Sequence, residues 1–108
     1  MRSTLAELVA YLNATLAVHT GAQAPDKRTD KYVIVMPVGG EPSLDAIHHD
    51  YALQAWATTY TDAEALVREV CDAMHDNGAA TMMASPIPLG YDGTHYWWQA
   101  SFTIHALW

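Results

Sequence analysis

The sequence has little that could cross-link it, hold a metal through sulfur or attract nucleic acid. Cys71 is the only cysteine in 108 residues, which excludes an internal disulfide and a cysteine-based zinc site. Lysine and arginine together number five, against twelve aspartates and glutamates, and the net charge is -7. Such a chain is repelled by DNA phosphates, so we expect no specific nucleic-acid binding.

Long apolar runs are also lacking. The first apolar stretch is amphipathic and contains Glu7, so it predicts neither a signal peptide nor a membrane span. We therefore expect no membrane partner and a place in the cytoplasm of the producing cell. Hydrophobic residues nevertheless make up 51% of the chain and charged residues only 16%. This composition predicts one folded domain over residues 1–108, part of whose surface is covered by partners.

Two amphipathic helices are predicted. The first covers about residues 4–18, where leucines recur at helical spacing behind a capping pair of Thr4 and Glu7. The second covers about residues 62–76, behind a similar pair of Thr61 and Glu64. Each helix has one apolar stripe, so each should pack against a single neighbouring layer.

Four strands are predicted, at about residues 32–36, 50–57, 81–85 and 95–108. The order helix, strand, strand, helix, strand, strand predicts an α+β fold, with an antiparallel sheet of about four strands and the two helices on one face. The other face should carry the mostly polar side of the last strand, namely Trp97, Gln99, Ser101, Thr103 and His105. His95 is expected on that outward side as well.

A metal or acid–base site is first sought at His48, His49 and Asp50, because imidazole and carboxylate are suitable ligands. Neighbouring residues on a strand point to opposite sides, and no HExxH-type spacing supplies further ligands. We interpret these residues as polar residues at the start of a strand. A small metal- or ligand-binding domain, or an enzyme, that uses them remains the alternative.

Other candidates also have a simple structural interpretation. Cys71 lies beside the apolar stripe of the second helix and is expected to be a small buried residue. Gly39 and Gly40 lack the lysine and hydroxyl residue of a phosphate loop and predict a hairpin loop. Trp97 is expected either to anchor an interface or to pack under a loop. The acids of the second helix predict a solvated face or, in an assembly, a negative rim or lumen: Asp62, Glu64, Glu69, Asp72 and Asp76.

Four segments together resemble the small tail terminator, or tail completion, proteins of long-tailed bacteriophages and prophages. They are the helix at residues 5–16, YVIVMPVGG at 32–40, DYALQAWATTYTDAEALVREVCDAM at 50–74 and YWWQASFTIHALW at 96–108. The resemblance implies a virion structural protein of the tail or neck, with no catalytic residues and no cofactor. It also implies a ring, commonly of six copies, that stops growth of the tail tube and offers a surface to the head connector.

The expected partners are therefore other copies of the chain, the tail tube protein and the head-completion or connector protein. DNA would pass through the lumen without being gripped. The candidate contact residues are Trp97, Gln99, Thr103, His105, Trp108, Gly39 and Gly40. Another phage neck or minor tail protein, or a general adaptor module, remains an alternative to the terminator.

Overall fold

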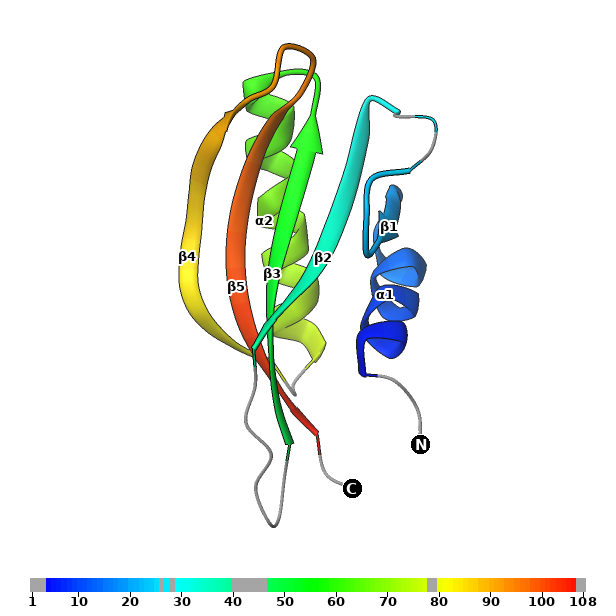
Figure 1. Ribbon diagram of the computed structural model, residues 1–108, viewed down its shortest axis with the longest axis vertical. Helices are drawn as coiled ribbons and strands as arrows, with labels where there is room; N and C mark the ends of the chain where they lie inside the picture. The colour runs from blue at the N-terminus through cyan, green and yellow to red at the C-terminus, as the bar shows by residue number, and fades with distance from the viewer. Residues whose placement is uncertain (1–3, 26, 28, 40–46, 78–79, 107–108) are drawn as a thin grey trace.

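A computed structural model describes residues 4–25, 27, 29–39, 47–77 and 80–106 (Figure 1). The elements are α1 (Thr4–Thr15), β1 (His19–Gly21), β2 (Lys31–Gly39), β3 (Ile47–Ala57), α2 (Tyr60–Asn77), β4 (Ala80–Tyr91) and β5 (Tyr96–Ala106). The α+β class and the order of the predicted elements are confirmed. The short strand β1 is additional and was not predicted.

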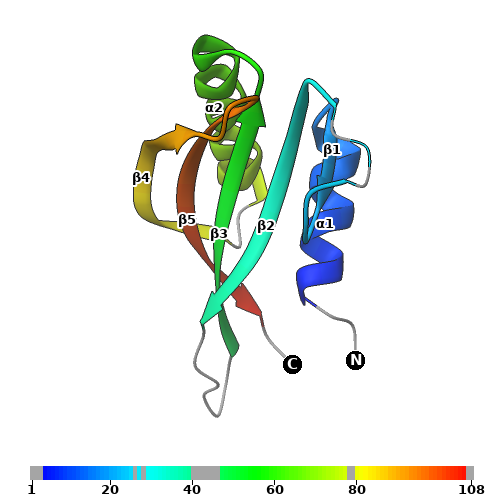
Figure 2. The same ribbon diagram turned by 45° about the horizontal axis from the view of Figure 1, so that its top comes forward.

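The sheet has five strands in the order β1-β2-β3-β5-β4. The pairs β2/β3, β3/β5 and β4/β5 are antiparallel, as predicted, whereas β1 runs parallel to β2 and makes the sheet mixed. Strands β1 and β4 are the two edges. In Figures 1 and 2, α1 lies at the β1 edge and β4 lies at the opposite side of the molecule.

Asn13 explains why a strand of three residues forms within a stretch that lacks apolar alternation. Its side-chain Nδ2 donates to the carbonyl of Thr20 at 2.8 Å, and its Oδ1 accepts from the N–H of Thr20 at 3.0 Å. The amide thus pairs with both backbone groups of Thr20, as a neighbouring strand would. This contact depends on α1 and β1 meeting in space, so the period of the sequence does not reveal it.

One hydrophobic core lies between the sheet and the two helices, which confirms that both helices cover the same face. Its main members are Leu8, Leu12, Val33, Val35, Leu53, Leu66, Val67, Val70, Met74, Ala100 and Phe102. In Figure 1, α2 runs behind the sheet along the strands. The hydroxyl of Tyr11 donates to the carbonyl of Ala73 at 2.6 Å and ties α1 to α2.

The ends of several elements differ from the prediction. Helix α1 stops at Thr15, and α2 begins at Tyr60. The hydroxyl of Thr59 accepts from the N–H of Asp62 at 3.2 Å, so Thr59 caps α2 and the predicted cap at Thr61 is wrong. Strand β4 continues through both of its prolines, with three shifts of register against β5. An edge strand can hold prolines because one side needs no partner.

Candidate interaction surfaces

The face of the sheet away from the helices, called the open face below, carries a row of stacked aromatic rings. Tyr32, Trp56 and Trp97 lie side by side on β2, β3 and β5. The ring centroids of Tyr32 and Trp56 are 5.7 Å apart, and those of Trp56 and Trp97 are 4.3 Å apart, with nearly parallel planes. Gly90 on β4 continues the row, and a Cβ there would meet the Trp97 indole at 3.4 Å. Trp97 is thus half-buried against its own sheet.

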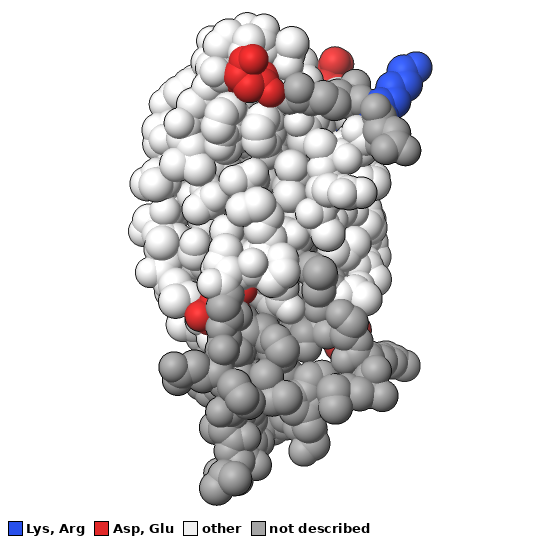
Figure 3. Space-filling model, in the orientation of Figure 1, with Lys and Arg blue, Asp and Glu red and all other residues white. Residues whose placement is uncertain are grey.

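The next rows of the open face are joined by hydrogen bonds. The amide of Gln54 donates to the Oε1 of Gln99 at 3.0 Å, and the indole N–H of Trp56 donates to the Oε1 of Gln54 at 3.1 Å. The hydroxyl of Thr103 donates to the carboxylate of Asp50 at 2.7 Å. Figure 3 shows the middle of this face without Lys, Arg, Asp or Glu. It is therefore a preorganised surface of low charge, with the Asp50 carboxylate toward one end.

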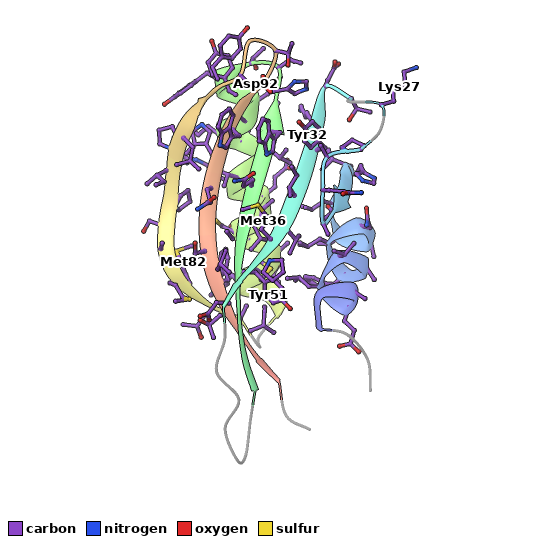
Figure 4. All side chains as sticks on the ribbon, viewed as in Figure 1. Lys27, Tyr32, Met36, Tyr51, Met82 and Asp92 are labelled. Atoms are coloured by element: carbon purple, nitrogen blue, oxygen red, sulfur yellow. The ribbon has the colours of Figure 1, made fainter. Side chains whose placement is uncertain are left out.

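His95 packs against Tyr32 on the expected side of the sheet, but only 5% of its surface is exposed, so the expectation of a solvent-exposed residue is wrong. Its ring packs on Tyr32 at 5.4 Å, and its Nε2 lies 2.8 Å from the carbonyl oxygen of Thr29. A carbonyl only accepts, so Nε2 must carry the proton of this bond. The carboxylate of Asp92 accepts from the backbone N–H groups of Thr94 and His95 and shapes the turn between β4 and β5. Figure 4 shows Asp92 and Tyr32 close to that end of the sheet.

The β4 edge carries an apolar surface that the sequence reasoning missed. Its large side chains are 43–57% exposed: Met82, Met83, Ile87, Leu89 and Tyr91. A pocket of about 210 Å³ opens beside it, lined by Tyr60, Pro88, Gly90, Tyr91, Tyr96, Trp97 and Trp98. The absence of any charged residue between Ala80 and Tyr91 was the signal in the sequence. The pattern predicts a short strand whose two prolines make its far end irregular or an edge; the edge position is confirmed, and the strand is longer than predicted.

The outer side of α2 is acidic. Glu69, Asp72 and Asp76 are exposed and line a groove of about 340 Å³ beside the end of α1. Glu64 and Asp62 are half-buried, and Glu64 is bound by Arg68 at 2.7 Å. All five predicted acids therefore belong to one helix, which carries five carboxylates and a single guanidinium group, that of Arg68.

Cys71 is half-buried beside the core. Burial, followed by the nearby Asp72 carboxylate, raises the pKa of its thiol above the ordinary value. The thiol is therefore neutral at physiological pH and a poor nucleophile. Burial also raises the pKa of Tyr51 on β3.

The remaining predicted contact residues can be placed only in part. Gly40 and Trp108 lie outside the described residues, and Gly39 and His105 are described through their backbone, at the ends of β2 and β5. His48 and His49 are backbone positions of β3 opposite His105 and Ile104, and their side chains lie outside the description. Within the described part, no three His, Cys, Asp or Glu residues gather to hold a metal ion. No described helix is long and apolar enough to span a membrane.

A small α+β subunit with a preorganised face of low charge, an apolar edge and one acidic helix has the surfaces of an assembly protein. Comparison with known families gives the class: the model of the tail completion protein gp17 family matches residues 3–106. The chain belongs to this family and is a structural protein of the phage tail. No curated protein matches it.

Proposed function

We propose that six copies of this chain form a ring that closes the end of the tail tube and joins it to the head connector. The observation that carries the proposal is membership of the tail completion family over nearly the whole chain. The copy number and the terminator role come from the resemblance of four segments to tail terminator proteins. A closed ring needs a dedicated contact surface on each subunit, and the apolar β4 edge supplies a candidate.

The charge distribution supports a ring through which DNA passes. Helix α2 collects five acids on one element: Asp62, Glu64, Glu69, Asp72 and Asp76. In the proposed ring this helix lines the lumen. An acidic wall repels the phosphate backbone, so DNA slides past it without being held. The open face and the two ends of the 45 Å long axis are then left for the tail tube protein and the connector.

The candidate contact residues divide between these surfaces. Trp97, Gln99 and Thr103 lie on the open face. Each already has a partner within the chain, so these side chains would meet a partner without being reordered. Binding is favoured when few side chains lose conformational freedom at the interface. The contacts proposed for Gly39, Gly40, His105 and Trp108 are tested by substituting these residues in the plasmid copy of the gene, in the deletion experiment described next.

The test is deletion of the gene from the phage or prophage that encodes it, with electron microscopy of the particles. Loss of a terminator should give tail tubes of excessive length that carry no head, and the intact gene supplied on a plasmid should restore normal tails. Tails of normal length that fail to join heads would point to another neck protein. Infectious particles of normal shape would refute both roles.

A parallel measurement determines the oligomer. Light scattering of the purified protein over a concentration series, with negative-stain imaging of the same samples, should show a closed ring with a central hole. A compact dimer without a hole, whose melting temperature rises with zinc or nickel, would instead favour the metal-site alternative at His48, His49 and Asp50.

A further inference from the structure

The apolar side chains of β4 form an exposed rim along both sides of this sheet edge, because the register against β5 places Met82 and Tyr91 on the side of the helices and Ile87 on the open side. Five such side chains stand near half exposure along one edge, which is more than the singly scattered apolar residues of an ordinary protein surface. The core of an interface is rich in large apolar residues and poor in charged ones, as this edge is.

This surface is suited to contact through side chains and poorly suited to pairing with another strand. Three register shifts interrupt β4, and Pro86 and Pro88 remove two backbone donors. Such features prevent the continuous ladder that an added strand would need. A partner must therefore cover Met82, Met83 and Ile87 with a surface of its own.

Helix α1, at the opposite side of the molecule, offers a surface that complements the exposed apolar side chains of β4. A solvated helix face normally carries charged residues, and α2 follows this rule. Helix α1 has one charged residue in twelve, Glu7, and its exposed positions include Ala6, Ala10 and Ala14. Small side chains on one surface let large ones on the other approach closely and interdigitate.

We propose that β4 of one copy packs on α1 of the next copy, and that this contact closes the ring. The inference rests on the proposed ring and names its interface. The two surfaces differ and lie at opposite sides of the subunit, as Figure 1 shows, so the contact is head-to-tail, the kind that generates rings. The acidic side of α2 is left uncovered, as the lumen requires, and the row of Tyr32, Trp56 and Trp97 on the open face stays available to the tail tube protein and the connector. A symmetric β4–β4 dimer would leave α1 uncovered and end at two copies.

Disulfide cross-linking tests the contact, in protein whose native cysteine is removed by Cys71→Ala. Two single variants, Ala10→Cys and Met83→Cys, place one thiol on each surface, and both residues are exposed. Under mild oxidation, an equal mixture of the two should give a covalent dimer, and either variant alone should give little. The double variant should give a ladder of species up to the size of the ring. The control combines Met83→Cys with Asp72→Cys on the outer side of α2, and should give no ladder.

The outcomes separate the interface from the ring. A ring seen by light scattering and imaging, without a cross-link between the two surfaces, overturns the interface and leaves the ring standing. A strong dimer from Met83→Cys alone establishes a symmetric contact and overturns the head-to-tail arrangement. A protein that stays monomeric in solution and on isolated tail tubes refutes the ring and, with it, this contact.

A charge substitution gives a second test. Ile87→Asp should convert the ring to monomers while leaving the melting temperature of the monomer within a few degrees, because Ile87 is about half exposed. Ala65→Asp on the exposed side of α2 is the matched control and should leave the ring intact. Rings formed equally well by both variants would overturn the assignment of β4.

Discussion

Replacing a threonine by valine should raise the stability of the fold at one position, Thr20, and lower it at another, Thr103. Thr20 on β1 is 1% exposed, and its Oγ1 has no hydrogen-bond partner in the described part of the chain. Thr103 on β5 is half-buried, and its hydroxyl donates to the Asp50 carboxylate at 2.7 Å. Valine has nearly the shape of threonine and a similar preference for strands, so the change tests the hydroxyl alone.

The magnitudes follow from the two environments. Burying a hydroxyl without a partner costs about 1–3 kcal/mol in protein mutational data, so Thr20→Val should stabilise the fold by about 1 kcal/mol or slightly more. A hydrogen bond to a charged group contributes about 1.5–3 kcal/mol. Water can reach the half-buried Asp50 and replace part of that bond, so Thr103→Val should destabilise by about 1 kcal/mol.

Urea unfolding followed by circular dichroism measures both effects. With a slope of about 1–3 kcal/mol per molar urea, the midpoints of the two variants should move by roughly 0.5 M in opposite directions. The control Thr20→Ser keeps the hydroxyl and removes the methyl group, so it should destabilise. A Thr20→Val protein that unfolds at lower urea than the parent would refute the reasoning, because the hydroxyl would then have a stabilising partner.

Three further predictions concern α1, the link between the helices and the single thiol. Asn13→Asp replaces the amide donor that faces the Thr20 carbonyl with a carboxylate oxygen, and should destabilise by about 1–3 kcal/mol; an unchanged melting temperature would show that the β1 pairing contributes nothing. Tyr11→Phe removes the bond to Ala73 and should cost about 0.5–1.5 kcal/mol, and hydrogen exchange should rise in α1 first. The pKa of the Cys71 thiol is raised in the folded state, so the folded state favours the neutral thiol. The contribution of this thiol to stability is complete below its ordinary pKa of 9.0 and is lost as pH rises through the raised folded-state pKa. Cys71→Ala should therefore lose less stability than the parent between pH 8 and pH 10 in urea titrations, and equal losses would contradict the assignment.

Local pattern was sufficient for the helices, for three of the strands and for the family. The apolar stripe of α2 and the alternation along β5 are periodic over more than ten residues, and such long periods are the most reliable signals in a sequence. The same alternation correctly placed Trp97 on the side of β5 away from the core. Helix ends were less well predicted, because Thr59 and Thr61 are both suitable caps and only the path of the chain selects one.

What the sequence alone determined about this protein is its class, the order of its main elements, the face that each one buries and the concentration of acids on α2. Those properties depend on residues close together in the chain, whose period and charge can be read directly. Only the tertiary structure decided that β1 exists, that His95 is buried and that β4 and α1 form two different apolar surfaces at opposite sides. Each of these depends on contacts between different elements of the fold, such as α1 with β1 through Asn13 and Thr20, or His95 with Thr29 across 66 positions. Contacts of that kind leave no periodic trace in the sequence, because they need only two residues to meet in space.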